Sequence, residues 1–165
     1  RGLGNEKLLP EGYLREPKSR LNRSTVIEHT KIARAQRNMH LEIGQPYLLN
    51  PNSSTNTFDA KQYFNAVVGI GFPQRFYQTL NKLGVNQYQA HEFPDHHDYE
   101  IADLTFDHHD VIITTEKDAV KFKTLLKQHP EFNIPIWVVP VEAVLSSDCY
   151  DLLRQQLQQV GIQFS

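Results

Sequence analysis

Asp95, His96 and His97 place one carboxylate beside two imidazole rings. This combination can hold a metal, orient a catalytic acid or relay a proton. Adjacent side chains on an extended segment point in opposite directions, so both rings are not expected to serve one centre. We therefore expect only one of the two histidines to be functional, and the sequence leaves open which one it is.

Thr115, Glu116, Lys117 and Asp118 form a second polar cluster. The Thr-x-x-Asp spacing is that of a capping box, which satisfies free amides at the start of a helix. Alternatively, Lys117 or Asp118 contacts a phosphate or a base, because the segment follows a predicted strand. The spacing by itself favours the capping box, and both interpretations stay open.

Gly69 and Gly71 flank Ile70 at the end of an apolar run. Glycines at such a place let the backbone approach a ligand closely, and the free amides of a following helix attract phosphate. Gln74, however, stands where a dinucleotide-binding fingerprint has its last glycine. Close packing of the strand against the helix is therefore the favoured interpretation.

Arg15 and Glu16 lie in a basic part of the chain. Residues 1–40 carry nine Lys and Arg against four Asp and Glu, whereas residues 41–165 carry eight against fifteen. Arg15 could clamp a phosphate while Glu16 orients it or joins a metal shell. A phosphorylated substrate or an anionic membrane surface would suit this segment, with a solvated loop as the alternative. Nucleic acid is disfavoured, because no stacking aromatics are interleaved with the basic residues.

Other reactive side chains are expected to be structural. His108, His109 and Asp110 precede a predicted strand, so we expect a solvated turn at the opposite edge of the sheet. Cys149 is the only cysteine, which rules out an intramolecular disulfide and indicates a reducing compartment.

Strands and helices alternate from about residue 60, which predicts an α/β fold with parallel strands and right-handed crossovers. The predicted strands are 65–71, about 87–93, 111–114 and 136–140. The predicted helices are 73–83, about 116–127 and about 148–160. The glycine motif at 69–71 and the two polar clusters each follow a strand, so they would share the carboxyl edge of the sheet, where α/β proteins bind ligands.

Upstream of this pattern the chain is less regular. Glycines, prolines and charges predict a loop over residues 1–23, followed by a short strand at 25–28. Alternating polarity predicts a two-stranded ribbon over residues 39–49, and the polar run 50–57 is the best internal boundary. No apolar run in the sequence is long enough to suggest a membrane span.

Six motifs, in order along nearly the whole chain, closely resemble those of the tetraacyldisaccharide 4′-kinases, the lipid A 4′-kinases of Gram-negative bacteria. They lie at residues 1–5, 8–17, 69–76, 93–97, 115–121 and 137–143. The resemblance is to the C-terminal half of that family only. Because the chain opens without Met and has no Gly-x-x-x-x-Gly-Lys-Ser/Thr loop, we expect a fragment that is inactive without its N-terminal half.

The resemblance implies transfer of the ATP γ-phosphate, with Mg²⁺, to the 4′-hydroxyl of tetraacyldisaccharide 1-phosphate at the cytoplasmic face of the inner membrane. It also implies a Rossmann-like parallel sheet with flanking helices, an N-terminal arm and a two-stranded β-ribbon linker. We accordingly assign residues 1–38 to the end of a P-loop kinase domain, residues 39–57 to the linker and residues 58–165 to a smaller lid domain.

Residue roles come from the same resemblance. Arg15, Glu16 and Asn5 are implied in binding the substrate phosphate, with the metal region near Glu16. One of His96 and His97 would support a catalytic aspartate of the N-terminal half. The nucleotide side of the lid would include Thr115, Glu116, Lys117 and Asp118. No metal ligand is assigned within this chain.

This chain departs from the family pattern at Glu11, Tyr13 and Phe72, and the last change puts a polar ligand contact in that loop in doubt. Two alternatives come from other classes of protein. Asp95, His96 and His97 could help to bind Mn²⁺ in a metal-dependent phosphoesterase, which would need further aspartates at strand ends. The basic arm could instead dock on anionic lipid as a non-catalytic module, through Arg15, Arg20 and Arg23.

Overall fold

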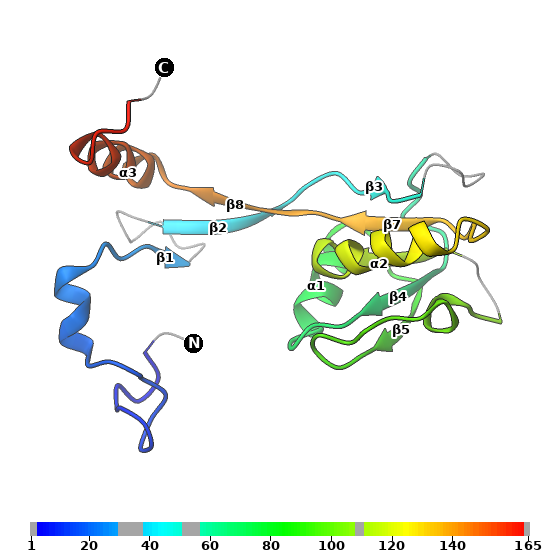
Figure 1. Ribbon diagram of the computed structural model, residues 1–165, viewed down its shortest axis with the longest axis horizontal. Coiled ribbons are helices and arrows are strands. Elements are labelled where there is room, and N and C mark those ends of the chain that lie inside the picture. Colours follow the sequence, from blue (N-terminus) through cyan, green and yellow to red (C-terminus); the bar gives the residue numbers. More distant parts are fainter. Residues whose placement is uncertain (1–2, 30–37, 51–56, 108–110, 164–165) are drawn as a thin grey trace. The chain divides into compact units, whose positions relative to one another are not determined.

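The computed structural model describes residues 3–29, 38–50, 57–107 and 111–163 (Figure 1). Its contacts divide the chain into two compact units, Arg1–Leu41 with Ala143–Ser165, and Glu42–Glu142. The predicted turn at 108–110 and most of the predicted boundary at 50–57 lie outside the described residues. Each unit is described by itself below.

A five-stranded sheet forms the centre of the unit Glu42–Glu142, with the strand order β3-β7-β6-β4-β5. Four of its strands pair in parallel with their neighbours: β4 (Phe64–Val68), β5 (Tyr88–Glu92), β6 (Ile112–Thr115) and β7 (Ile136–Val139). The short strand β3 (Tyr47–Leu48) pairs antiparallel with β7 and closes one edge. The predicted α/β fold with a parallel sheet is confirmed.

Two helices cover opposite faces of this sheet. Ala66 and Val68 of β4 belong to one core cluster together with Leu80 of α1 (Gln74–Lys82). Val67, between them, belongs to a second cluster with Phe122 of α2 (Glu116–Gln128). Because successive strand side chains point to opposite faces, β4 is apolar on both faces except at the buried Asn65, whose Oδ1 atom lies 3.0 Å from Nε2 of His91. Both helices end within one residue of the predicted bounds.

The predicted pairing of the two halves of segment 39–49 is wrong. Strand β2 (Asn38–Ile43) lies between β1 (Glu28–His29) and β8 (Val141–Leu145) in a three-stranded sheet, whereas β3 pairs with β7. The reason is that only Pro140 separates β7 from β8. The chain therefore passes from β7, the partner of β3, directly into β8, the partner of β2. Gly44 donates its amide proton to the Pro140 carbonyl at 3.0 Å, and a Cβ there would lie 2.9 Å from the Pro140 ring.

The other unit holds the 3-10 helix η1 (Lys18–Arg23), strand β1 and helix α3 (Ser147–Gln159). Residues 143–165, which we assigned to the lid domain 58–165, group by their contacts with the N-terminal segment. Hydrogen bonds explain this: the Ser146 amide donates to the Asn38 carbonyl at 2.9 Å, and Gln156 donates to Thr25 at 2.9 Å. Cys149 is buried there, in keeping with the structural role predicted for it.

Candidate active site

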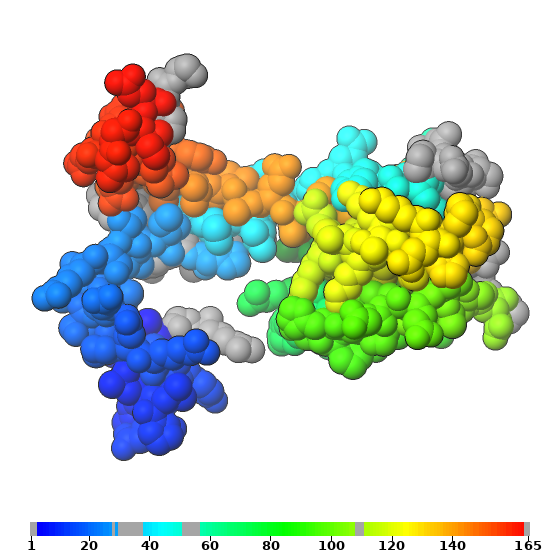
Figure 2. All heavy atoms as spheres, viewed as in Figure 1, coloured from blue at the N-terminus to red at the C-terminus, as the bar shows by residue number. Residues whose placement is uncertain are grey.

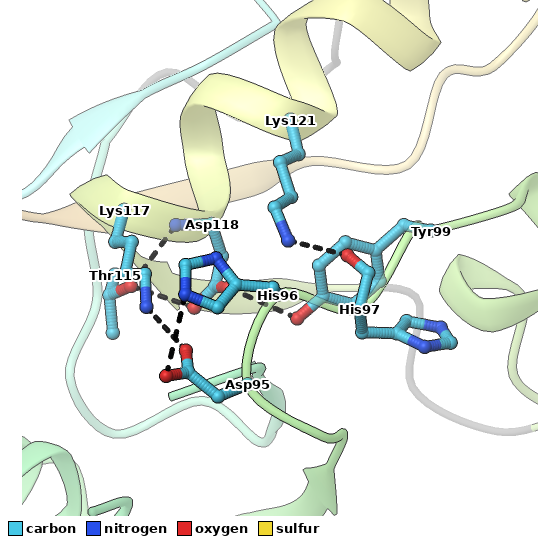
Figure 3. Close-up of polar contacts among 8 residues, drawn as sticks. All are labelled: Asp95, His96, His97, Tyr99, Thr115, Lys117, Asp118 and Lys121. Carbon is cyan, nitrogen blue, oxygen red and sulfur yellow. Dashed lines mark hydrogen bonds and ion pairs between the residues drawn. The ribbon is translucent and has the colours of Figure 1, made fainter. Parts of the chain in front are cut away.

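The three predicted clusters do share one edge of the five-stranded sheet. Strands β5, β4 and β6 are adjacent and parallel, so the segments that follow them leave from the same side. The segment after β5 carries Asp95, His96 and His97, and α2 begins directly after β6. Figure 3 shows these side chains gathered around the first turns of α2. This juxtaposition makes the carboxyl edge the candidate site.

Asp95 is tied to the start of α2. Its Oδ1 atom accepts a hydrogen bond from Nζ of Lys117 at 2.5 Å, and its Oδ2 atom lies 3.7 Å from Nε2 of His96. The hydrogen bond from Lys117, helped by the charges of His96 and Lys117, holds the pKa of the Asp95 carboxyl below its ordinary value. Asp95 is therefore an anion that joins a lysine and an imidazole at the sheet edge.

His96 presents its ring to solvent. Its side chain is 80% exposed, and its backbone has φ of 65°, in the left-handed region that residues other than glycine seldom adopt. Strained backbone of this kind persists where the surrounding structure imposes it, and it is often found at functional sites. The ring lies beside Asp95 and Lys117 at the edge (Figure 3).

His97 is engaged inside the protein instead. Its Nε2 atom lies 3.0 Å from Oδ2 of Asp103, and its ring stacks on Phe93 with the centroids 4.6 Å apart. The Tyr99 ring packs on the same imidazole in a T-shaped arrangement, with the centroids 4.9 Å apart. Figure 3 shows the His97 ring pointing away from Asp95. The sequence could not distinguish the two histidines, whereas the structure gives His97 a packing role and leaves His96 accessible.

Asp103 lies in the short 3-10 helix η2 (Ile101–Leu104). Burial raises the pKa of its carboxyl, but the hydrogen bond from the Glu100 amide and the proximity of His97 outweigh burial and lower it overall. The partner of His97 is therefore a carboxylate at neutral pH, and it fixes the imidazole ring in place.

Thr115 caps α2 as predicted, but the second bond of a capping box, from the Thr115 amide to the Asp118 side chain, is replaced by a bond from the Thr115 hydroxyl. The Thr115 hydroxyl accepts from the Asp118 amide at 3.3 Å and donates to Oδ2 of Asp118 at 2.8 Å. Oδ1 of Asp118 accepts from the Tyr99 hydroxyl at 3.1 Å, and the Asp118 side chain is fully buried. The hydrogen bonds of Asp118 therefore stabilise the start of α2. Lys117 is the one cation among the four residues predicted to face a nucleotide, and it lies at the sheet edge.

Glu116 has a further structural contact. Its Oε2 atom accepts a hydrogen bond from the Val141 amide at 3.4 Å, which joins the start of α2 to the strand that continues from β7. Burial, with the charge of Glu116 as the second cause, raises the pKa of the Tyr47 hydroxyl on the neighbouring strand β3.

The two glycines after β4 differ in what surrounds them. A Cβ at Gly69 would lie 2.5 Å from the Tyr99 hydroxyl and 3.2 Å from Oδ1 of Asp118, so close packing requires glycine there. A Cβ at Gly71 would meet only Asp95, at 3.9 Å. The favoured packing interpretation is therefore right for Gly69, whereas Gly71 lies at the open edge.

Sequence reasoning missed two cationic residues that the structure brings to this edge. Arg75, in the first turn of α1, places its guanidinium 5.5 Å from the centre of the Phe72 ring. Lys121 donates from Nζ to the His97 carbonyl at 2.5 Å. Lys121 follows Lys117 by one helical turn, and this i, i+4 spacing was the signal that could have revealed it.

The predicted phosphate-binding residues Asn5, Arg15 and Glu16 belong to the other compact unit, in its N-terminal segment, which is blue in Figure 2. Asn5 closes its own loop: its Nδ2 atom donates to the Glu11 carbonyl at 3.0 Å, and its Oδ1 atom accepts from the Lys7 amide at 3.2 Å. Glu16 forms an exposed ion pair with Arg20 at 3.2 Å. Arg15 is exposed.

Within residues 3–29, 38–50, 57–107 and 111–163, no group of three or more His, Cys, Asp or Glu side chains is arranged to hold a metal ion. In the same part of the chain, no helix is both long enough and apolar enough to cross a membrane.

Comparison with known proteins identifies the family. The family model for tetraacyldisaccharide-1-P 4′-kinase matches residues 1–158 of the chain. The chain belongs to the tetraacyldisaccharide-1-P 4′-kinase family. Members of this family include the tetraacyldisaccharide 4′-kinases of Psychrobacter cryohalolentis and Psychrobacter arcticus, which are 38% and 36% identical to the whole chain. The chain spans 53% of each of these relatives, about half of their length.

A solved structure shows the same fold. The family member LpxK from Aquifex aeolicus, crystallised in complex with ATP, matches 96% of this chain and 49% of its own chain with a TM-score of 0.62. The sequences are 21% identical, so this likeness supports the fold, and the resemblance seen in the sequence motifs is confirmed by the family match itself.

Proposed function

We propose that the chain is the C-terminal portion of a kinase that transfers the γ-phosphate of ATP to the 4′-hydroxyl of tetraacyldisaccharide 1-phosphate, a step in lipid A biosynthesis. The observation that carries this proposal is the family match over residues 1–158. The coverage of about half of each relative supports the placement in the C-terminal portion. The geometry of the sheet edge then supports particular roles for its residues.

In phosphoryl transfer, a bond forms between the attacking hydroxyl oxygen and the γ-phosphorus while the bond to the bridging oxygen breaks and ADP leaves. The hydroxyl proton goes to a base, which we place on a carboxylate in a segment outside this chain. His96 is the histidine suited to orient that base, because its ring is exposed at the edge whereas the His97 ring is bonded to Asp103. His97 supports the loop from within.

The positive charges of residues at the sheet edge complement the negative charge of the ATP phosphates. Phosphoryl transfer depends mainly on positioning and on neutralising the charge of the phosphate oxygens. Lys117 and Arg75 place two cations at the start of α2 and α1, where free helix amides also favour anions. Mg²⁺ would neutralise further phosphate charge. Because the described residues hold no group of three or more His, Cys, Asp or Glu arranged for a metal, we place its ligands on ATP and outside this chain.

For the lipid substrate, we place the phosphate near the exposed Arg15, with Glu16 and the loop held by Asn5 beside it. Arg15, Arg20 and Arg23 are all exposed cations on this arm, which suits an anionic surface. The proposed location is the cytoplasmic face of the inner membrane, where ATP and the acylated disaccharide can meet.

The test uses radiolabelled γ-phosphate and tetraacyldisaccharide 1-phosphate. The enzyme expressed from the complete reading frame should phosphorylate the disaccharide in an ATP-dependent reaction, and the 165-residue chain alone should not. Failure of the complete, folded enzyme to transfer phosphate would overturn the proposed function. Transfer by the isolated chain would overturn the proposal that it needs a further segment.

A further inference from the structure

The loop that carries His96 is held by a residue of α2 that sequence reasoning did not select. Lys121 donates from Nζ to the main-chain carbonyl of His97 at 2.5 Å. The same ammonium group lies 5.7 Å from the centre of the Tyr99 ring, within the range of a cation–π contact. Lys121 is half-buried, so these contacts are made in a partly dry environment, where they are stronger than at a fully exposed site.

A second clamp acts on the ring of the same residue. Oδ2 of Asp103 lies 3.0 Å from Nε2 of His97 and also accepts from the Glu100 amide at 2.9 Å. The His97 amide donates to the Pro94 carbonyl at 3.0 Å, which closes a tight turn around Asp95 and His96. The residue after His96 is therefore fixed through its amide, its carbonyl and its side chain.

This fixation explains how His96 can hold its backbone conformation. A φ of 65° costs free energy for a residue with a Cβ, so neighbouring contacts have to impose it. The hydrogen bond between the His97 amide and the Pro94 carbonyl closes the turn around His96. The hydrogen bond from Lys121 fixes the His97 carbonyl, which follows that turn. Loss of the Lys121 bond would free this carbonyl and let the loop relax, which would move the His96 ring.

We propose that Lys121 is a positioning residue for catalysis: it holds the His97 carbonyl so that the loop presents the His96 ring at the sheet edge. This inference rests on the proposed function of His96. It assigns no contact between Lys121 and either substrate. Lys121 differs in this from Lys117, whose ammonium group bonds Asp95 at the edge itself.

A double-mutant cycle in the complete enzyme tests the inference. The variants are Lys121→Met, His96→Ala and their combination, with Lys123→Met as the matched control, because Lys123 is an exposed lysine on the same helix. We expect Lys121→Met to lower kcat roughly tenfold to 100-fold without changing the KM for ATP, since misplacing a catalytic group by about 1 Å has effects of this size. Lys121→Arg should restore most of kcat, and Lys123→Met should match the parent enzyme.

The combination decides how Lys121 acts. If it acts through His96, Lys121→Met should cause no further loss in the His96→Ala background. Additive losses, or a Lys121→Met enzyme as active as Lys123→Met, would overturn the positioning role while leaving the role of His96 intact. A fully active His96→Ala enzyme would instead overturn the role proposed for His96, and with it this inference. Should Lys121→Met fail to fold, Lys121→Gln, alone and combined with His96→Ala, carries the same test.

Discussion

The Tyr99 hydroxyl donates a hydrogen bond to Oδ1 of Asp118 at 3.1 Å, and both side chains are buried. This bond joins the loop after β5 to the first turn of α2. Burial first, and the charge of Asp118 second, raise the pKa of the Tyr99 hydroxyl far above its ordinary value, so it stays a donor. Tyr99 also packs on the His97 ring, so one side chain supports both the helix start and the loop that presents His96.

Tyr99→Phe should lower the free energy of unfolding by about 1–3 kcal/mol, because it leaves a buried carboxylate oxygen without its donor. Chemical denaturation of the chain, followed by circular dichroism, measures this loss. Tyr13→Phe is the matched control, since the Tyr13 side chain is 88% exposed. Equal stability of the two variants would show that the Tyr99 bond does not support the fold.

Gly69→Ala should destabilise the chain by about 1–3 kcal/mol, because overpacking a well-packed site has costs of this order. The new methyl group would lie 2.5 Å from the Tyr99 hydroxyl, and the Tyr99 to Asp118 bond would have to shift. Gly71→Ala supplies the control, because its nearest neighbour would be 3.9 Å away. Thermal unfolding of both variants tests the contrast, and a Gly71→Ala variant as unstable as Gly69→Ala would contradict it.

The pKa of the Asp95 carboxyl should rise when Lys117 is replaced by Met. Lys117 is the main cause of the lowered value, so its removal should return the pKa toward 3.8. The pKa of Asp95 is lower in the folded state than in the unfolded state. The Asp95–Lys117 pair therefore stabilises the fold at pH values above the unfolded-state pKa, and this stabilisation is lost as the pH falls through the folded-state pKa. NMR titration of the Asp95 side chain measures the shift. An unchanged titration in Lys117→Met, as expected for Lys123→Met, would argue against the ion pair.

Acidification from pH 7.5 to 5.5 should weaken the fold partly through His91. Burial lowers the pKa of this ring, which lies 3.0 Å from Oδ1 of Asn65 and packs on Phe106. Below about pH 6.5 the His91 ring therefore binds a proton more readily in the unfolded chain than in the folded one. The free energy of unfolding accordingly decreases as the pH is lowered. His91→Gln should lose less stability than the parent over this range. Equal slopes for the parent and His91→Gln would exclude this cause.

The sequence predicted the parallel sheet and the shared strand edge because both depend on local patterns. Continuous apolar runs mark strands buried on both faces, and the Thr-x-x-Asp spacing marks the start of α2. The pairing of β2 with β8 could not be predicted in this way, because their residues are about a hundred positions apart in the chain. Local turn signals suggested the nearer partner, which the structure does not use.

The roles of the paired histidines could not be separated by sequence for a related reason. His96 and His97 have the same chemistry and differ in what folding places beside them. Asp103 and Lys121 reach His97 from η2 and α2, and these contacts depend on the path of the loop after β5. A spacing rule predicted that the rings diverge, and the tertiary contacts decide which one remains accessible.

The most direct test of the role of His96 is the rate of γ-phosphate transfer by the complete enzyme carrying His96→Ala, beside His129→Ala as a control that replaces a histidine at the far end of α2. We expect kcat to fall about 10²- to 10⁴-fold for His96→Ala, the size typical of lost acid–base assistance, with the KM for ATP unchanged. The control should keep the parent rate. A His96→Ala enzyme that transfers phosphate as fast as the parent would contradict the central claim that His96 serves the reaction at this sheet edge.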